Sequence, residues 1–377
     1  MFGASVTALS CADVGRCAIG GAYVDAAGAN QPWVADSTGG TFGAAHRLIT
    51  LGAVPQRIAT VTSLSCALPG NCTAGISLAV QPPGQSAQSA AFVASEVSGT
   101  WSAVQALPSP IRAGGPPPPD GINSLSCWSP GNCLAGGFYN SNGVLHTLVG
   151  LQSNGTWVNL AFTEIPGITN LVGYDPSAAT MIRSVSCVAS GDCALVGSYT
   201  DTALHTQVFD ATKNASGAWF AQTLPGSAEL NVGGNAQLAS VSCAAAGDCA
   251  TSGFSLPAPG IVQSLVDVEQ GGAWVRAQEI LGIANLPSAL GGPVSCGGVG
   301  SCSAVGWYTD TAAHRQAYIV NENAHTWGGA IQVAGNLNAG GNAQATAVSC
   351  SLTGICAAGG TYTDATGRIQ GFVVDES

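Results

Sequence analysis

A short stretch with two cysteines six positions apart occurs seven times in this chain, and it limits the possible folds more than any other feature. Examples are SVSCVASGDC (184–193), SVSCAAAGDC (240–249) and AVSCSLTGIC (347–356). The pairs are Cys11 and Cys17, Cys66 and Cys72, Cys127 and Cys133, Cys187 and Cys193, Cys243 and Cys249, Cys296 and Cys302, and Cys350 and Cys356. They use all 14 cysteines. Successive pairs begin 53 to 61 residues apart, and self-similarity at such a period indicates a repeat architecture.

Two further positions are constant in all seven copies. A serine stands directly before each first cysteine: Ser10, Ser65, Ser126, Ser186, Ser242, Ser295 and Ser349. A glycine stands two positions before each second cysteine: Gly15, Gly70, Gly131, Gly191, Gly247, Gly300 and Gly354. Glycine adopts positive φ at little cost, which suits a tight turn. The motif therefore predicts a strand, a turn and a second strand.

Each repeat has the pattern of four short strands. After the first strand (SVSC), a second begins at the second cysteine (CALVGSY), and a polar turn leads to a third (TQVFDA). A Gly-x-Trp turn opens the fourth, and no segment shows a sustained helical period, so we expect very little helix. Four strands repeated seven times predict an all-β fold, a seven-bladed β-propeller of antiparallel blades. We expect one domain over residues 1–377, with blades starting near 5, 60, 121, 181, 237, 291 and 345.

Two other architectures fit the repeat less well. A β-solenoid usually has a shorter repeat, and units of this size are too small to build separate cores. The seventh repeat stops after its third strand (GFVVDES). Either the last blade has three strands, or the chain is a fragment of a longer one.

The cysteine spacing favours one disulfide within each hairpin. A zinc site needs four ligands at one place, whereas each repeat offers two cysteines. A disulfide that closes so short a loop restricts the unfolded chain by about 2 kcal/mol. Such bonds persist in oxidising compartments, so we expect a secreted or cell-surface protein. The N-terminus (MFGASVTALSC) has no signal-sequence pattern, and no apolar run is long enough to span a membrane.

Charged side chains are scarce. They make up 8 % of the chain, with a net charge of −11 and Lys213 as the single lysine, whereas an average protein has about 25 %. Nucleic acids and anionic membranes bind to basic patches. We therefore expect neither nucleic acid binding nor membrane insertion. We also expect a monomer with no cofactor and no metal.

The loop between the second and third strands carries the candidate binding residues. Tyr-x-Asp recurs there as Tyr23 and Asp25, Tyr199 and Asp201, Tyr308 and Asp310, and Tyr362 and Asp364. A glutamine lies 14 positions after the second cysteine in five repeats, at 31, 207, 263, 316 and 370, with His205 and His314 two positions before it in two of them. Asp in a hairpin loop commonly caps its own backbone. In the structural interpretation, the repeated Asp therefore serves only to stabilise its turn. The functional hypothesis is a set of equivalent shallow sites in which Tyr stacks on a sugar and Asp binds its hydroxyls.

An enzyme is the main alternative to a binding module. The sequence has no Gly-x-Ser-x-Gly, no His-Glu-x-x-His and no phosphate-binding loop. A glycosidase would need two carboxylates within about 5 to 10 Å of each other. Spacing along the chain does not show which carboxylates lie that close in space. We name no catalytic residue.

The unit SVSCxxxGxCxAxGxY, followed by Gly-x-Trp, resembles a repeat of exported bacterial proteins that are mostly of unassigned function. The likeness covers essentially the whole chain and implies a propeller and export, but no catalytic residue. SNGTW (153–157) is similar to the Asp-box turn of sialidase-like propellers, yet it lacks the Asp and separates Gly from Trp by one residue. A sialidase is therefore not supported. We expect an exported module that binds extracellular or cell-wall polysaccharide; a protein-interaction scaffold and a carbohydrate-active hydrolase or lyase are the alternatives.

Overall fold

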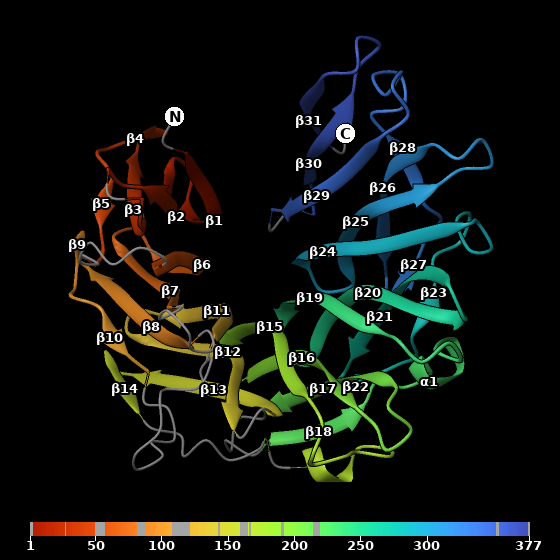
Figure 1. Cartoon of the computed structure of the whole chain (residues 1–377), viewed down its shortest axis with the longest axis horizontal. Helices are drawn as coiled ribbons and strands as arrows, with labels where there is room; N and C mark the ends of the chain where they lie inside the picture. The colour runs from red at the N-terminus through yellow and green to blue at the C-terminus, as the bar shows by residue number, and fades with distance from the viewer. Residues whose placement is uncertain are drawn as a thin grey trace. The chain divides into compact units, whose positions relative to one another are not determined.

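The chain is built almost entirely of β-strands (Figure 1). The computed structural model describes residues 3–26, 28–49, 57–80, 88–107, 121–141, 144–158, 165, 167–189, 192–213, 219–351 and 354–375. Within these residues the helical segments are the 3-10 turn η1 (Ile168–Asn170) and the short helix α1 (Ser227–Leu230). The prediction of very little helix is confirmed.

The strands of each repeat form an antiparallel blade, and a parallel bridge between Asn30 and Ile58 joins the first two blades into one sheet. The first three blades are β1 (Ala4–Asp13), β2 (Arg16–Val24), β3 (Asn30–Thr38), β4 (Thr41–Phe42) and β5 (His46–Arg47); β6 (Arg57–Leu68), β7 (Asn71–Val80), β8 (Gln88–Val97), β9 (Thr100–Trp101) and β10 (Gln105–Ala106); and β11 (Gly121–Ser129), β12 (Asn132–Ser141), β13 (Val144–Ser153) and β14 (Thr156–Val158). The fourth repeat contains β15 (Thr180–Ala189), β16 (Asp192–Thr200), β17 (Thr206–Lys213) and β18 (Trp219–Thr223).

The last three blades follow the same plan. They are β19 (Gln237–Ala245), β20 (Asp248–Ala258), β21 (Ile261–Gln270), β22 (Ala273–Trp274) and β23 (Gln278–Glu279); β24 (Ser288–Gly298), β25 (Ser301–Thr309), β26 (Arg315–Asn323), β27 (Thr326–Trp327) and β28 (Ile331–Val333); and β29 (Ala343–Cys350), β30 (Cys356–Thr363) and β31 (Ile369–Asp375). The described part of the last blade has three strands. The predicted fold class, all-β with propeller blades, is confirmed.

The chain divides into two compact units. One contains Met1–Ile165 and Ala179–Ser190, and the other contains Pro166–Ala178 and Gly191–Ser377. The division falls inside the fourth repeat. The expectation of one domain over the whole chain stays a prediction.

The cysteine hairpins have the predicted disulfides. In six blades the two cysteines bond to each other, with Cα atoms 3.9 to 4.0 Å apart, because they stand directly opposite each other in the first two strands. Cys187 and Cys193 are disulfide-bonded as well, and no described cysteine is free. The seven bonds are consistent with an oxidising environment.

The constant glycine lies where two turns of one blade touch. Gly131 has φ of 70°, and a Cβ atom there would lie 2.7 Å from the backbone nitrogen of Gly155. Gly155 instead donates its N–H to the Gly131 carbonyl at 2.8 Å. The same contact joins Gly40 to Gly15, Gly99 to Gly70, Gly272 to Gly247, and Ala324 to Gly300. Only glycine allows both the backbone angle and this close approach.

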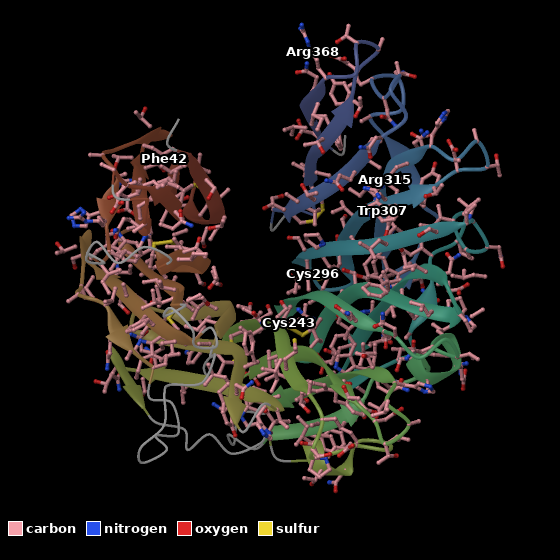
Figure 2. All side chains as sticks on the ribbon, viewed as in Figure 1. Phe42, Cys243, Cys296, Trp307, Arg315 and Arg368 are labelled. Carbon is pink, nitrogen blue, oxygen red and sulfur yellow. A yellow bond between two sulfur atoms is a disulfide. The ribbon has the colours of Figure 1, made fainter. Side chains whose placement is uncertain are left out.

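The constant serine links neighbouring blades. Its hydroxyl accepts a hydrogen bond from the backbone N–H of the next blade's first cysteine, at 2.9 to 3.0 Å. The pairs are Ser10 with Cys66, Ser65 with Cys127, Ser126 with Cys187, Ser242 with Cys296, and Ser295 with Cys350. Cys243 and Cys296, on consecutive blades, are labelled in Figure 2. The serine therefore accepts a hydrogen bond from a cysteine N–H that the cysteine's own blade leaves unpaired.

The core lies between neighbouring blades. The apolar residue two before the first cysteine is only 5 to 7 % exposed in five blades: Leu64, Leu125, Val185, Val241 and Val294. In the first unit, Val93 and Leu107 of the second blade pack with Ile122 and Trp157 of the third. Within each unit, neighbouring blades thus bury apolar faces against each other, as in a propeller.

Replacing Ser65 by Ala should destabilise the protein by about 1 to 3 kcal/mol, because it leaves the N–H of Cys127 without an acceptor. Urea unfolding of the oxidised protein measures the change. Ser349→Ala is the control, since the Ser349 hydroxyl makes no hydrogen bond within the described residues. Equal effects of the two substitutions would contradict the structural role of the serine.

Candidate functional site

The Asp of each Tyr-x-Asp hairpin is bound within its own turn. Asp201 accepts the N–H groups of Ala203 and His205 at Oδ1, each at 2.9 Å, and the Gln207 amide at Oδ2, also at 2.9 Å. Equivalent bonds hold Asp310, Asp364 and Asp25, with Gln316, Gln370 and Gln31 as the amide donors. These contacts are those of a turn cap.

The hydrogen bonds favour the charged form of these carboxyl groups. The Gln316 amide, followed by the N–H of His314, lowers the pKa of Asp310. The Thr366 hydroxyl and the N–H of Arg368 lower the pKa of Asp364 to about 2. These carboxylates are therefore ionised at neutral pH and already occupied by donors from their own loops.

The two histidines pack on glycines of the loop that leads to the next blade. A Cβ atom on Gly234 would lie 2.5 Å from Cδ2 of His205, and one on Gly341 would lie 2.7 Å from Cδ2 of His314. These glycines belong to the related segments LNVGGNAQ (230–237) and LNAGGNAQ (337–344). The histidines thus help to fix a loop in place.

The asparagines of these segments complete the attachment. Asn231 donates its amide to Oε1 of Gln207 at 3.0 Å and to the Thr206 carbonyl at 2.9 Å. Asn338 does the same with Gln316 at 3.1 Å and the Arg315 carbonyl at 2.9 Å. Arg315, labelled in Figure 2, also lies over the Trp307 ring, 4.0 Å from its centre. Asp, Gln and Asn therefore form one chain of hydrogen bonds from hairpin to loop.

The tyrosines differ in exposure. Tyr199 is buried, and its hydroxyl donates to the Val172 carbonyl at 2.9 Å, whereas Tyr23, Tyr308 and Tyr362 are half-buried. Each Tyr-x-Asp pair stays within its own hairpin. The contacts favour the structural interpretation, and binding of a glycan by these residues stays a prediction.

Sequence analysis did not find a groove between the second and third blades. This groove, which we call the tryptophan groove, has a volume of about 530 Å³, and its lining includes Ser95, Trp101, Ser102, Gln105, Gly155 and Trp157. None of the described residues that line it is charged. The indole N–H of Trp157 is buried and has no acceptor among the described residues, whereas that of Trp101 donates to Asp36 at 2.8 Å.

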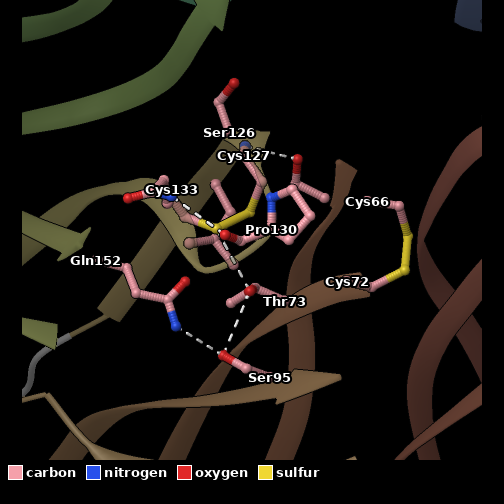
Figure 3. Close-up of a disulfide and its surroundings, with 12 residues drawn as sticks. Cys66, Cys72, Thr73, Ser95, Ser126, Cys127, Pro130, Cys133 and Gln152 are labelled. Atoms are coloured by element: carbon pink, nitrogen blue, oxygen red, sulfur yellow. Dashed lines mark hydrogen bonds between the residues drawn. A yellow bond between two sulfur atoms is a disulfide. The ribbon is translucent and has the colours of Figure 1, made fainter. Parts of the chain in front are cut away.

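A polar network supports the base of this groove (Figure 3). Gln152 donates its amide to the Ser95 hydroxyl at 3.1 Å, and Ser95 lies 3.4 Å from the Thr73 hydroxyl. Thr73 in turn lies 3.4 Å from Sγ of Cys133. Ser95 is thereby held in position, while the hydroxyl of Ser102 and the amide of Gln105 are on exposed residues at the rim.

A second hollow, which we call the carboxyl pocket, lies between the first and second blades. It has a volume of about 200 Å³, and Arg16, Asp36, Ser37 and Glu96 are among its lining residues. Glu96 is only 4 % exposed. Burial, and then the charge of Asp36, raises the pKa of Glu96 to about 7.

Buried carboxyl groups recur in the second unit. Burial raises the pKa of Asp267 to about 7, and burial together with Asp248 raises that of Glu269 to about 7. The pKa values of Asp210 and Glu322 are also raised, chiefly by burial. Glu269 and Glu322 stand opposite the second cysteine of their blades, where the third blade has Gln152. The regular position of these glutamates was visible in the sequence, because Glu269, Glu322 and Glu376 each follow the second cysteine of their repeat by 20 positions.

The described residues contain no group of three or more His, Cys, Asp or Glu that could hold a metal ion. Among the helices of the described part of the chain, none is long and apolar enough to cross a membrane.

Comparisons with known proteins give similarity in structure alone. No family model matches the chain, and no curated protein matches it. Among solved structures, YCF48 bound to D1 peptide is 11 % identical, with a TM-score of 0.46, and the match covers 99 % of this chain and 91 % of that one. The Hadza microbial sialidase Hz136 is 11 % identical, with a TM-score of 0.45 and coverage of 97 % and 64 %. The GH93 α-L-arabinofuranosidase of Fusarium graminearum is 11 % identical, with a TM-score of 0.43 and coverage of 83 % and 92 %. The fold assignment rests on the repeated sheets and disulfides described above.

Stability should fall as the pH rises from about 5 to 8. The folded state binds protons on Glu96, Asp267 and Glu269 up to about pH 7, whereas the unfolded chain loses them near the ordinary values of 4.5 and 3.8. The contribution of these protons to the free energy of unfolding is therefore largest at the low end of this range, and it is lost as the pH rises through 7. Thermal unfolding at pH 5 and pH 8 measures it. Glu269→Gln should reduce the slope, and a Tm that rises with pH would contradict the prediction.

Replacing Asp201 by Ala should lower the Tm and speed hydrogen exchange at the amides of Ala203 and His205, because both lose their acceptor. Exchange followed by mass spectrometry or NMR checks this. An unchanged Tm and unchanged exchange, together with loss of glycan binding, would instead make Asp201 a ligand-binding residue.

Proposed function

We propose that this chain is an exported, non-catalytic binding module for a neutral polysaccharide, which binds in the tryptophan groove. The buried indole N–H of Trp157 carries the proposal. The residue is 6 % exposed, and this N–H has no acceptor among the described residues; the N–H groups of Trp33, Trp274 and Trp327 share that feature, but of the four only Trp157 lines the groove. An unpaired buried donor costs free energy, and a ligand oxygen placed in the groove would recover that cost.

The other lining groups match a sugar. An indole presents an apolar face to the C–H groups of a pyranose ring, and a few polar groups around it can fix orientation. Trp101 is half-buried beside the groove, and Ser102 and Gln105 offer hydroxyl and amide groups at its rim. The lack of charge favours a neutral ligand over an acidic or basic one. The seven disulfides support export, because such bonds persist outside the reducing cytosol.

Two other functions from sequence analysis are outcomes of the same test. A protein-interaction scaffold would bind a peptide in place of a glycan, and a hydrolase or lyase would consume the polysaccharide. The Tyr-x-Asp hairpins would bind a glycan at several equivalent sites, whereas the tryptophan groove would bind it at one. The number of sites per chain therefore separates these two binding hypotheses.

Replacing Trp157 by Phe should weaken glycan binding about 2- to 12-fold, the effect of losing one hydrogen bond of 0.5 to 1.5 kcal/mol. Glycan-array screening followed by calorimetry on the best neutral glycan measures the affinity and the number of sites. Trp274→Phe is the matched control, since Trp274 occupies the same turn position in the fifth blade and is equally buried. Equal weakening by both substitutions, or the absence of any glycan ligand, would contradict the proposal.

A further inference from the structure

The carboxyl pocket contains two carboxyl oxygens without donors. Oε2 of Glu96 and Oδ1 of Asp36 are buried, and neither has a hydrogen-bond partner among the described residues. The remaining oxygens are used: Oδ2 of Asp36 accepts from Trp101, and the Glu96 carboxyl accepts the N–H of Cys72. Buried oxygens of this kind cost free energy until a donor reaches them.

Arg16 supplies the opposite charge in the same pocket. It is exposed, it lines the pocket with Asp36 and Glu96, and it makes no ion pair within the described residues. The pocket therefore has two buried carboxyl oxygens without donors and, in Arg16, a cation without an ion pair among the described residues. Its volume of about 200 Å³ is below that of a pocket for a drug-sized molecule, about 300 to 1,000 Å³, so its ligand must be small.

We propose that the carboxyl pocket binds a free α-amino acid as its zwitterion. The ammonium group donates to Oε2 of Glu96 and Oδ1 of Asp36, and the carboxylate pairs with Arg16. An ammonium carries three donors and no acceptor, so it satisfies both orphan oxygens at once. A guanidinium pairs with a carboxylate through two parallel hydrogen bonds. No covalent step is involved, and the site is separate from the polysaccharide proposal.

The site arises from departures from the repeat. At the position of Glu96 the third blade has Gln152, which fills its place with a hydrogen bond to Ser95. In the second unit, Glu269 stands opposite the second cysteine of its blade, as Gln152 does in the third blade, and it does not line the carboxyl pocket. The combination of an unpaired oxygen on Glu96, an unpaired oxygen on Asp36 and an arginine without an ion pair therefore belongs, among the pockets described, to the junction of the first two blades.

Calorimetric titration of the oxidised full chain with glycine tests the proposal, with methylammonium and acetate as half-ligands. Glycine should bind with a stoichiometry of one, and at least 10-fold more tightly than either half-ligand. Glu96→Gln should weaken glycine binding at least 10-fold, and Glu269→Gln should leave it unchanged. Gln152 shows that an amide is accepted at this register, so Glu96→Gln should fold.

Arg16→Ala provides a second variant on the surface of the protein. It should weaken glycine binding and leave methylammonium binding unchanged. The proposal is overturned if glycine does not bind at millimolar concentration, if methylammonium binds as tightly as glycine, or if Glu269→Gln weakens binding as much as Glu96→Gln does. Glycan binding by the tryptophan groove, measured on the same variants, reports separately on the proposed function.

Discussion

The hydrogen bond from the first cysteine's N–H to the serine hydroxyl of the preceding blade sets the arrangement of consecutive blades within each unit. It needs a serine at one fixed position and a strand held at one fixed register. The disulfide supplies that register, because it joins the two cysteines that stand opposite each other in the same hairpin. The glycine then lets the hairpin turn meet the outer turn of its own blade. Each constant feature thus makes one contact: the serine bonds to the next blade, the disulfide joins the two strands of a hairpin, and the glycine meets the outer turn of its blade.

Most repeated residues are used for structure, and the candidate sites add residues that vary between blades to a few repeated ones, such as Trp101 and Trp157. The Asp, Gln and Asn of the hairpins and loops bond to one another. The tryptophan groove and the carboxyl pocket instead depend on residues that vary between blades, such as Gln105, Arg16 and Asp36. Duplication of a blade copies a stable unit, and later substitutions can create a ligand site without disturbing the contacts that hold the blades.

The sequence predicted the blades well because their determinants are local. Cys127 and Cys133 are separated by one turn, so spacing alone established their disulfide and the strands on either side. The candidate sites were not predictable in the same way. Trp157 and Ser95 meet in one groove although they are 62 positions apart, and nothing in the spacing says which side chains of two blades face each other. Glu96 follows its second cysteine by 24 positions, whereas Glu269 and Glu322 follow theirs by 20, so spacing did not reveal it. The raised pKa of Glu96 also depends in part on Asp36 from another blade.

Amide hydrogen exchange at the first cysteines tests the central claim most directly. If the serine hydroxyls accept these bonds, the amides of Cys66, Cys127, Cys187, Cys296 and Cys350 belong to the slowest-exchanging class in the oxidised protein. Exposed turn amides such as that of Gly39 or Gly271 provide the fast reference within the same sample. First-cysteine amides that exchange as fast as these turn amides would contradict the account.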